Sequence, residues 1–142
     1  MKTLFKISII CCLFIAASCD ETKKVIDTAS QVQLTGDYTV NMVNNNKIDN
    51  NITIAFNPLN KQINGDAGCN SYFGSYNVSN FELTFSGVGS TKKLCQPASI
   101  MKSEQEFLSA LDNVGSYRLN NNVLTLYSKI DNAIVISANK KE

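Results

Sequence analysis

The chain has 142 residues and no histidine. This absence removes the usual general base near neutral pH, the commonest zinc ligand and the base of an ordinary serine triad. A Ser–Lys pair or a pair of carboxylates would be the remaining option for catalysis. The carboxylates in question are scattered along the sequence and are interpreted as solvated charges: Asp37, Asp66, Glu82 and Asp112. We therefore predict no catalytic residues, no metal and no cofactor, and expect that the protein is not an enzyme.

The chain also has no surplus of either charge, with 13 Lys plus Arg against 12 Asp plus Glu. If the first 18 residues are removed as a signal, Lys2 and Lys6 leave with them, and eleven basic residues face twelve acidic ones. Phosphate neutralisation needs a basic surface, so no nucleic-acid partner is predicted. The balance gives no reason to expect a polybasic grip on anionic lipid either.

Long hydrophobic runs are missing too. Lys2 and Lys6 precede an apolar run, residues 7–15, which is followed by small residues at 16–18 and then by Cys19. This order is typical of a secretory signal. The 13 residues from 7 to 19 would span about 20 Å as a helix, against roughly 30 Å of bilayer hydrocarbon, so no permanent transmembrane helix is expected.

The segment Ile15-Ala16-Ala17-Ser18-Cys19 resembles a bacterial lipobox. The resemblance implies that residues 1–18 are a lipoprotein signal peptide and that Cys19 carries lipid as the mature N-terminus. Two or three acyl chains hold a protein stably on a membrane, whereas one does not. The alternative is ordinary cleavage after residues 16–18, which would leave Cys19 as a free thiol.

Residues 20–33, DETKKVIDTASQVQ, are polar and lack regular apolar spacing. We interpret residues 19–33 as a lipidated N-terminus and a flexible tether, whose reach as a coil would be roughly 20 Å. The acidic start at Asp20 and Glu21 bears on lipoprotein sorting, although bacterial lineages use it differently. We expect a cell-envelope location and favour the outer membrane, with the periplasmic or surface leaflet left open.

Without the signal, and with Cys19 lipidated, Cys69 and Cys95 are the two thiols that remain in an oxidising compartment. We predict that they form one disulfide, worth roughly 3.5 kcal/mol in the chain-entropy model. Two independent thiols are the alternative, since lone buried cysteines are common.

From residue 34 onward, apolar and polar residues mostly alternate as in half-buried strands. Ile52, Ile54 and Phe56 would share one face, as would Phe81, Leu83 and Phe85. Similar runs occupy 38–43, 72–78, 123–127 and 133–137. Asn-rich turns separate the runs, so neighbouring strands should pair antiparallel.

One segment has helical periodicity instead, with Ile100, Phe107, Leu108 and Leu111 on one face. Ser103 and Glu106 would form a capping box, with Ser99 as an earlier alternative. The prediction is therefore a mainly β (α+β) fold, in which an antiparallel, curled and barrel-like sheet of about seven strands is covered by one amphipathic helix near 99–113. It forms a single domain over 34–138, followed by a tail at 139–142.

Ordered blocks of residues carry a family resemblance. The blocks are Gly65-x-Ala67-Gly68-Cys69-Asn70-x-Tyr72-x-Gly74-x-Tyr76, Phe81-x-Leu83-x-Phe85, Ser90-Thr91-Lys92-x-x-Cys95 and Glu104-x-Glu106-Phe107-Leu108-x-x-Leu111. They resemble the META/HslJ domain family, also catalogued as a domain of unknown function. The resemblance implies a small secreted or lipid-anchored protein with a barrel-like β fold and a helix. It also implies structural roles for the motif residues Gly65, Gly68, Asn70, Gly74 and Thr91, and makes both cysteine blocks hallmarks.

The chain departs from the family pattern at two places. Tyr38 stands where the opening motif usually has tryptophan, and Lys93-Leu94 replaces the usual Met-Ala before the second cysteine. Neither departure changes the fold assignment. Both put in doubt any surface role that the usual side chains have elsewhere in the family.

The GCN triplet can be interpreted without the family. Gly68 permits positive φ or close backbone approach, and Asn70 can bond its own backbone in a turn. We predict a strand start or bulge there, tied through Cys69 to the segment before the helix, with Gly65 and Gly74 as bulge or close-packing glycines. A phosphate-cradling loop would need a following helix, whereas a strand follows here.

Three function classes follow. The first is a non-enzymatic, lipid-anchored binding module for envelope maintenance or stress tolerance, with the membrane and an unidentified envelope protein as partners. The second is a pilotin-like carrier that shelters an acyl chain or a partner helix, because the family's barrel is broadly similar to secretin-pilot folds. The third is an enzyme or an enzyme inhibitor. An apolar cavity larger than a few waters would favour the carrier, and a filled interior would favour the binding module.

Overall fold

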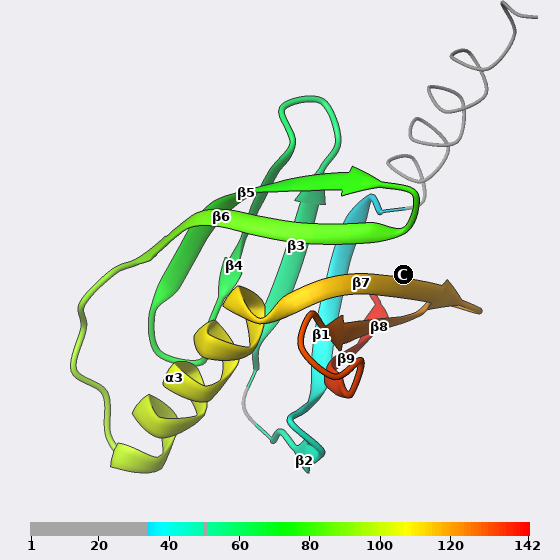
Figure 1. Ribbon diagram of the computed structural model, residues 1–142. Coiled ribbons are helices and arrows are strands. Elements are labelled where there is room, and N and C mark those ends of the chain that lie inside the picture. Colours follow the sequence, from blue (N-terminus) through cyan, green and yellow to red (C-terminus); the bar gives the residue numbers. More distant parts are fainter. Residues whose placement is uncertain (1–33, 50) are drawn as a thin grey trace, which may run out of the picture.

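Nine strands and helix α3 make up the part of the chain that the computed structural model describes, residues 34–49 and 51–142 (Figure 1). The elements run in the order β1 (Gly36–Val43), β2 (Asn46–Lys47), β3 (Thr53–Asn57), β4 (Gln62–Asp66), β5 (Ser71–Ser79), β6 (Glu82–Ser90), α3 (Ala98–Asp112), β7 (Val114–Asn120), β8 (Val123–Ser128) and β9 (Ile134–Lys140). The predicted helix is confirmed to within one residue at each end.

The sheet closes on itself. Each strand pairs antiparallel with its neighbour in the order β2-β1-β3-β4-β5-β6-β7-β8-β9, and β1 also pairs with β9. Tyr38 of β1 faces Ile54 of β3 on one side and Lys140 of β9 on the other. Eight strands therefore form an antiparallel barrel, with β2 as a short hairpin extension of β1. The predicted barrel-like β fold with one helix is confirmed, with one more barrel strand than expected.

Alternating side chains fill the barrel interior. Along β5 every second residue is buried, from Tyr72 through Tyr76 to Val78, while the residues between them face outward. Phe56 of β3 sits at the centre of an aromatic cluster, edge-on to Tyr38 at 5.8 Å and to Tyr76 at 5.2 Å between ring centroids. Edge-to-face aromatic pairs of this kind add to the free energy gained from burial. The centre of the barrel is thus packed with side chains.

The barrel is least complete between β6 and β7, which share only the pair Glu82–Ser116 in register. Beside this pair, the Tyr117 N–H donates to the Phe81 carbonyl at 3.2 Å. Helix α3 lies over this weakly paired part of the sheet. It contacts β6, β9 and β1, and it buries Phe107 and Leu111 in the core.

Within the described residues, no helix is long and apolar enough to span a bilayer.

Because neighbouring strands are antiparallel, the connections between them lie at two opposite ends of the barrel. We call the end where β1 begins the N-terminal end. It also carries the β3–β4 loop, the β5–β6 and β7–β8 turns and the end of β9. The opposite end carries the β1–β2, β4–β5 and β8–β9 connections and the loop from β6 to α3. The start and the end of the barrel chain therefore lie at one end, and the β4–β5 loop lies at the other.

Several local predictions were wrong. Helix α3 has Pro97 at its N-cap position with no side-chain cap, and the Ser103 hydroxyl donates to the Ser99 carbonyl at 3.1 Å, so neither serine caps the helix. Such bonding to the preceding turn competes with capping. Phe81 does not share the inner face with Leu83, because it lies in the β5–β6 turn with φ +68° and is 54% exposed.

Strand boundaries differ as well. The structure contains β4 and β7, which the alternation of the sequence did not predict. Strand β9 continues to Lys140, so residues 139 and 140 pair with β1 and do not belong to a tail. The proposed lipidation site at Cys19, together with the tether, lies outside the described residues.

Candidate functional site

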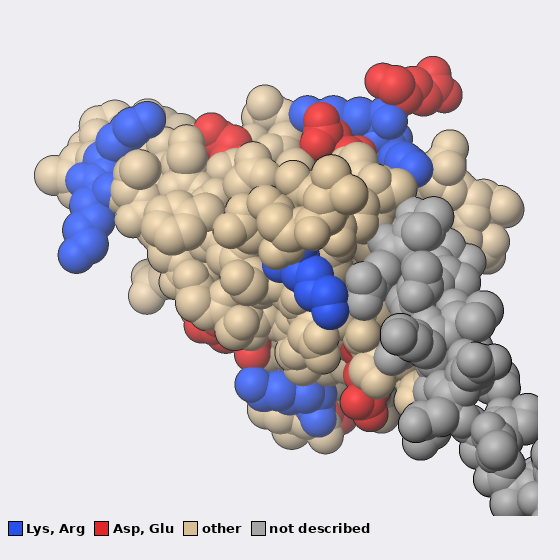
Figure 2. All heavy atoms as spheres, turned by 90° about the horizontal axis from the view of Figure 1, so that it is seen from above, with Lys and Arg blue, Asp and Glu red and all other residues tan. Residues whose placement is uncertain are grey.

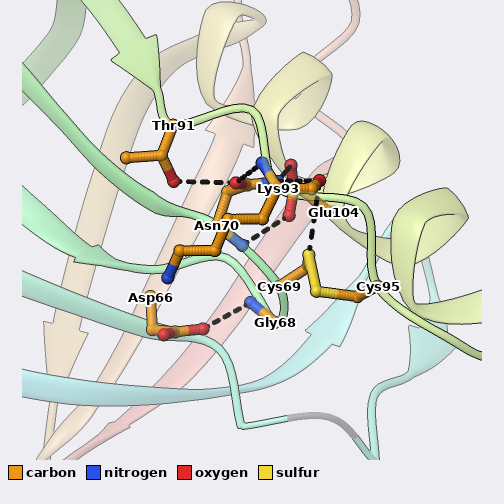
Figure 3. Close-up of a disulfide and its surroundings, with 8 residues drawn as sticks. All are labelled: Asp66, Gly68, Cys69, Asn70, Thr91, Lys93, Cys95 and Glu104. Carbon is orange, nitrogen blue, oxygen red and sulfur yellow. Dashed lines mark hydrogen bonds between the residues drawn. A yellow bond between two sulfur atoms is a disulfide. The ribbon is translucent and has the colours of Figure 1, made fainter.

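A disulfide joins the two cysteine blocks at the opposite end of the barrel (Figure 3). Cys69 lies in the β4–β5 loop and Cys95 in the loop from β6 to α3, with Cα atoms 5.9 Å apart. The predicted pairing is therefore present in the structure, and it connects a barrel hairpin to the segment that leads into the helix. The Cys69 Sγ lies 3.7 Å from the Lys93 carbonyl oxygen, a contact only, since a disulfide sulfur carries no hydrogen.

The loop that carries Cys69 is a tight turn built by local hydrogen bonds. The Asp66 carboxylate accepts the Gly68 N–H at 2.7 Å, and the Ala67 N–H donates to the Asn70 carbonyl at 2.8 Å. Gly68 has φ +104°, a conformation that side-chain-bearing residues rarely adopt. The turn delivers the chain into β5 at residue 71, where a strand start was predicted.

Asn70 and Glu104 form a buried pair between this turn and helix α3. The Asn70 N–H donates to Glu104 Oε2 and the Asn70 Nδ2 donates to Oε1, both at 2.8 Å. Asn70 is 1% exposed and Glu104 is 6% exposed. A buried carboxylate needs hydrogen-bond partners to offset its lost hydration, and here one residue supplies two of them.

The oxygen of the Asn70 side-chain amide connects to the loop from β6 to α3. Its Oδ1 accepts from the Thr91 hydroxyl and from the Lys93 N–H, each at 2.7 Å. Asn70 thus connects the β4–β5 loop, the β6–α3 loop and the helix (Figure 3). Lys93 takes part through its backbone, which explains why the departure from the family pattern at 93 and 94 leaves the network intact. The Leu94 side chain is 93% exposed.

Gly65 marks a close approach of two strands. A Cβ on this residue would collide with the carbonyl oxygen of Thr53 and lie 2.9 Å from the Tyr72 ring. That same carbonyl accepts the Tyr72 hydroxyl at 2.9 Å. Gly74 faces the core, where an added Cβ would lie 3.1 Å from a Val88 methyl carbon. Both glycines therefore occupy positions where a side chain would displace neighbouring atoms.

This arrangement holds parts of the fold together, and its buried polar groups are bonded to one another. The Glu104 oxygens accept from Asn70, and the Thr91 hydroxyl donates to it. Across residues 34–49 and 51–142, no group of three or more His, Cys, Asp or Glu could hold a metal ion. Of the carboxylates noted in the sequence, Asp37 and Glu82 are exposed on separate strands.

Sequence reasoning missed Glu104, Lys93 and Asp66 as members of this network. A signal for Glu104 existed, since it lies four residues after Ile100 and three before Phe107, on the apolar face of the helix. Its partner Asn70 is 34 residues away, and no local pattern connects them. Asp66 was interpreted as a solvated charge, whereas it is half-buried and holds the turn through Gly68.

The fold and these connections define the class of protein. It is an antiparallel eight-stranded barrel with one covering helix in the described residues, and a disulfide and a buried Asn–Glu pair connect the β4–β5 loop to the helix and to the segment before it. The chain belongs to the META domain family, whose model matches residues 30–141. No curated protein sequence matches it.

Solved structures are similar in fold. A protein from Burkholderia xenovorans solved by NMR is 18% identical, with a TM-score of 0.62 over 80% of this chain and 88% of that one. Another protein solved by NMR is 24% identical, with a TM-score of 0.59 over 75% and 92%. A DUF4847 family protein from Bacteroides vulgatus is 16% identical, with a TM-score of 0.51 over 80% and 99%. These likenesses concern the fold alone.

Proposed function

We propose that this META domain is a non-enzymatic binding module that a lipidated Cys19 anchors to the bacterial cell envelope, with the outer membrane as the favoured location. The observation that carries the binding function is the filled barrel. Large side chains that are almost completely buried occupy its centre, among them Tyr38, Tyr72, Ile54 and Leu126. A carrier for an acyl chain or a helix needs an apolar cavity in that place. The packed interior therefore favours contacts made by the outer surface.

The outer surface suits protein contacts of mixed character. Figure 2 looks down on the molecule from above the view in Figure 1 and shows a mostly uncharged face with positive and negative groups, several of them side by side, near its edges. Apolar side chains protrude from loops, with Leu59 95% exposed, Leu94 93% and Ile130 81%. An exposed apolar side chain in a mixed surface suits a small protein interface better than a nucleic acid.

The anchor is tested on the mature protein. Mass spectrometry of its N-terminus should find Cys19 with the mass of attached acyl chains, and the protein should sediment with membranes. A Cys19→Ala variant should lose both the mass and the sedimentation. An unmodified Cys19, or an N-terminus at residue 20, would contradict anchoring.

The binding function is tested in intact cells. A photo-crosslinking amino acid is placed at Leu59, Leu94 or Ile130, one site at a time, and at the exposed helix residue Ser109 as a polar control. We expect a discrete protein adduct from at least one apolar site and none from Ser109. Loss of the same adduct in the Cys19→Ala variant would connect binding to the anchor. Absence of any protein adduct from all three apolar sites would contradict the binding module.

A further inference from the structure

The start of β1 is flanked by two other parts of the chain at the N-terminal end of the barrel. On one side, Gly36 pairs with Phe56, so the β3–β4 loop that follows lies beside it. On the other side runs the end of β9, whose Lys140 pairs with Tyr38. The Lys140 side chain reaches Gly36, where an added Cβ would lie 3.5 Å from its Cε. The β3–β4 loop and the end of β9 therefore border the first residues of β1.

These flanking segments carry one exposed leucine and three lysines, which we name the tether-side patch: Leu59, Lys61, Lys140 and Lys141. Lys141 is held in place because its N–H donates to the Asp37 carbonyl at 2.8 Å. The ion pairs in the described part of the chain, Lys47–Asp49 and Lys102–Glu106, involve none of these lysines. An apolar tip beside lysines with long apolar stems suits the boundary between headgroups and acyl chains.

Exposure alone does not decide which end of the barrel faces the lipid, since Leu94 at the opposite end is 93% exposed. The length of chain between the proposed anchor and the barrel favours the N-terminal end. Fourteen residues, 20–33, separate Cys19 from Leu34, and they span at most roughly 50 Å when fully extended. As a coil they would average roughly 20 Å. A strand of eight residues is about 26 Å long, so the opposite end lies farther from the anchor by a similar distance.

We propose that the tether-side patch rests on the lipid surface, with Leu59 inserted at the boundary between headgroups and acyl chains. Leu94 and Ile130 then face away from the membrane toward envelope partners. This inference rests on the proposed lipid anchor at Cys19 and adds a definite orientation to it.

The chain contains no tryptophan, so a single introduced tryptophan reports its own surroundings. Leu59→Trp and Leu94→Trp are a matched pair, because both replace nearly fully exposed leucines in loops. Each full chain is produced in a lipidating host, purified with its acyl chains and reconstituted into phosphatidylcholine vesicles with brominated acyl chains. Bromine quenches indole fluorescence only at close range.

We expect the emission of Leu59→Trp to shift to the blue and to fall roughly by half in brominated vesicles, as for an interfacial side chain. The emission of Leu94→Trp should stay the same in brominated and ordinary vesicles. Equal emission of Leu59→Trp in the two lipids, or stronger quenching of Leu94→Trp, would overturn the proposed orientation.

Flotation of both variants with the vesicles tests the lipid anchor separately from the orientation of the barrel. Protein that floats while Leu59→Trp stays unquenched is anchored but not oriented as proposed. Protein that does not float overturns the anchor and the orientation together. A second measurement tests the lysines: replacing Lys61, Lys140 and Lys141 with glutamine in the Leu59→Trp chain should reduce quenching when anionic lipid is added, and leave it unchanged without anionic lipid.

Discussion

At the scale of single residues, Asn70 is the point where three segments of the chain meet. Its backbone and side-chain N–H groups donate to Glu104, and its Oδ1 accepts from Thr91 and Lys93. Removing one partner from such a network leaves buried donors without acceptors, which costs more than the net value of the bonds. The stability of the helix attachment should therefore depend on Glu104 far more than on other charged residues of α3.

Replacing Glu104 with alanine is expected to lower the free energy of unfolding by about 3 kcal/mol, because two buried N–H groups of Asn70 lose their charged acceptor. Glu106→Ala is the matched control on the same helix. Glu106 is 3.9 Å from Lys102 in an exposed ion pair, and its loss should cost less than about 0.5 kcal/mol. Urea unfolding followed by circular dichroism measures both. Equal losses would show that the buried pair contributes nothing special.

Two buried tyrosines differ in their hydroxyl groups. The Tyr72 hydroxyl donates to the Thr53 carbonyl at 2.9 Å, whereas the buried Tyr76 hydroxyl has no hydrogen-bond partner among the described residues. We expect Tyr76→Phe to raise the free energy of unfolding by about 1 kcal/mol, since an unsatisfied polar atom is removed, and Tyr72→Phe to lower it by a similar amount. Denaturant midpoints of the two variants should move in opposite directions. A shift to lower denaturant in both would refute this reasoning.

Much of the site could be predicted from residue types. Cys69 and Cys95 could be identified because they are the two thiols left if the predicted signal is removed and Cys19 is lipidated, and Gly68 because a turn beside a strand favours positive φ. Glu104 could not be assigned a role in this way. Its acceptor function depends on a residue 34 positions away that only the folded barrel brings near. The helical spacing places it with Phe107 on the buried face, but this spacing does not identify its partner.

At the scale of elements, the strands with regular alternation were predictable and the others were not. Strand β3 buries Ile54 and Phe56 at a period of two. Strand β4 buries a single residue, Ile63, so its pattern is too weak to detect. In β7 the register shifts between residues 114 and 116, and the buried residues Val114 and Tyr117 are therefore three apart. A bulge breaks the period on which strand prediction depends.

The junction between β6 and β7 should open before the rest of the barrel. These strands share only the Glu82–Ser116 pair, whereas β8 and β9 pair over most of their length. Local opening follows the number of pairings that must break. In hydrogen exchange followed by NMR, the Tyr117 amide, which donates to Phe81, should exchange at least about tenfold faster than amides inside the β8–β9 ladder. Equal protection of the Tyr117 amide and the β8–β9 amides would contradict this, and would mean that α3 stabilises the β6–β7 junction as much as a complete set of strand hydrogen bonds does.

At the scale of the whole molecule, burial raises the pKa of the Tyr38, Tyr72 and Tyr76 hydroxyls above the usual value of 10.0. A smaller effect of Tyr117 acts in the same direction on Tyr38 and Tyr76. Above about pH 10 the unfolded chain therefore loses protons that the folded chain keeps. Stability is unaffected by these groups below that pH and falls as the pH rises beyond it.

We expect the urea midpoint to be level between pH 7 and 9 and to drop between about pH 10 and 11.5. Absorbance at 295 nm should show that buried tyrosines ionise only together with unfolding. A Tyr76→Phe chain should lose less stability over the same interval, because one of the raised groups is absent. A midpoint that stays level to pH 11.5 would contradict the assignment.

Closure of the sheet by its first and last strands has a consequence for the order of folding. Strand β1 finds its second neighbour only in β9, residues 134–140, which follows all the other strands along the chain. Until β9 is in place, β1 and β8 each present an open edge that could pair with another chain. The ring is therefore complete only when β9 has docked, and a chain without β9 is expected to be prone to aggregation.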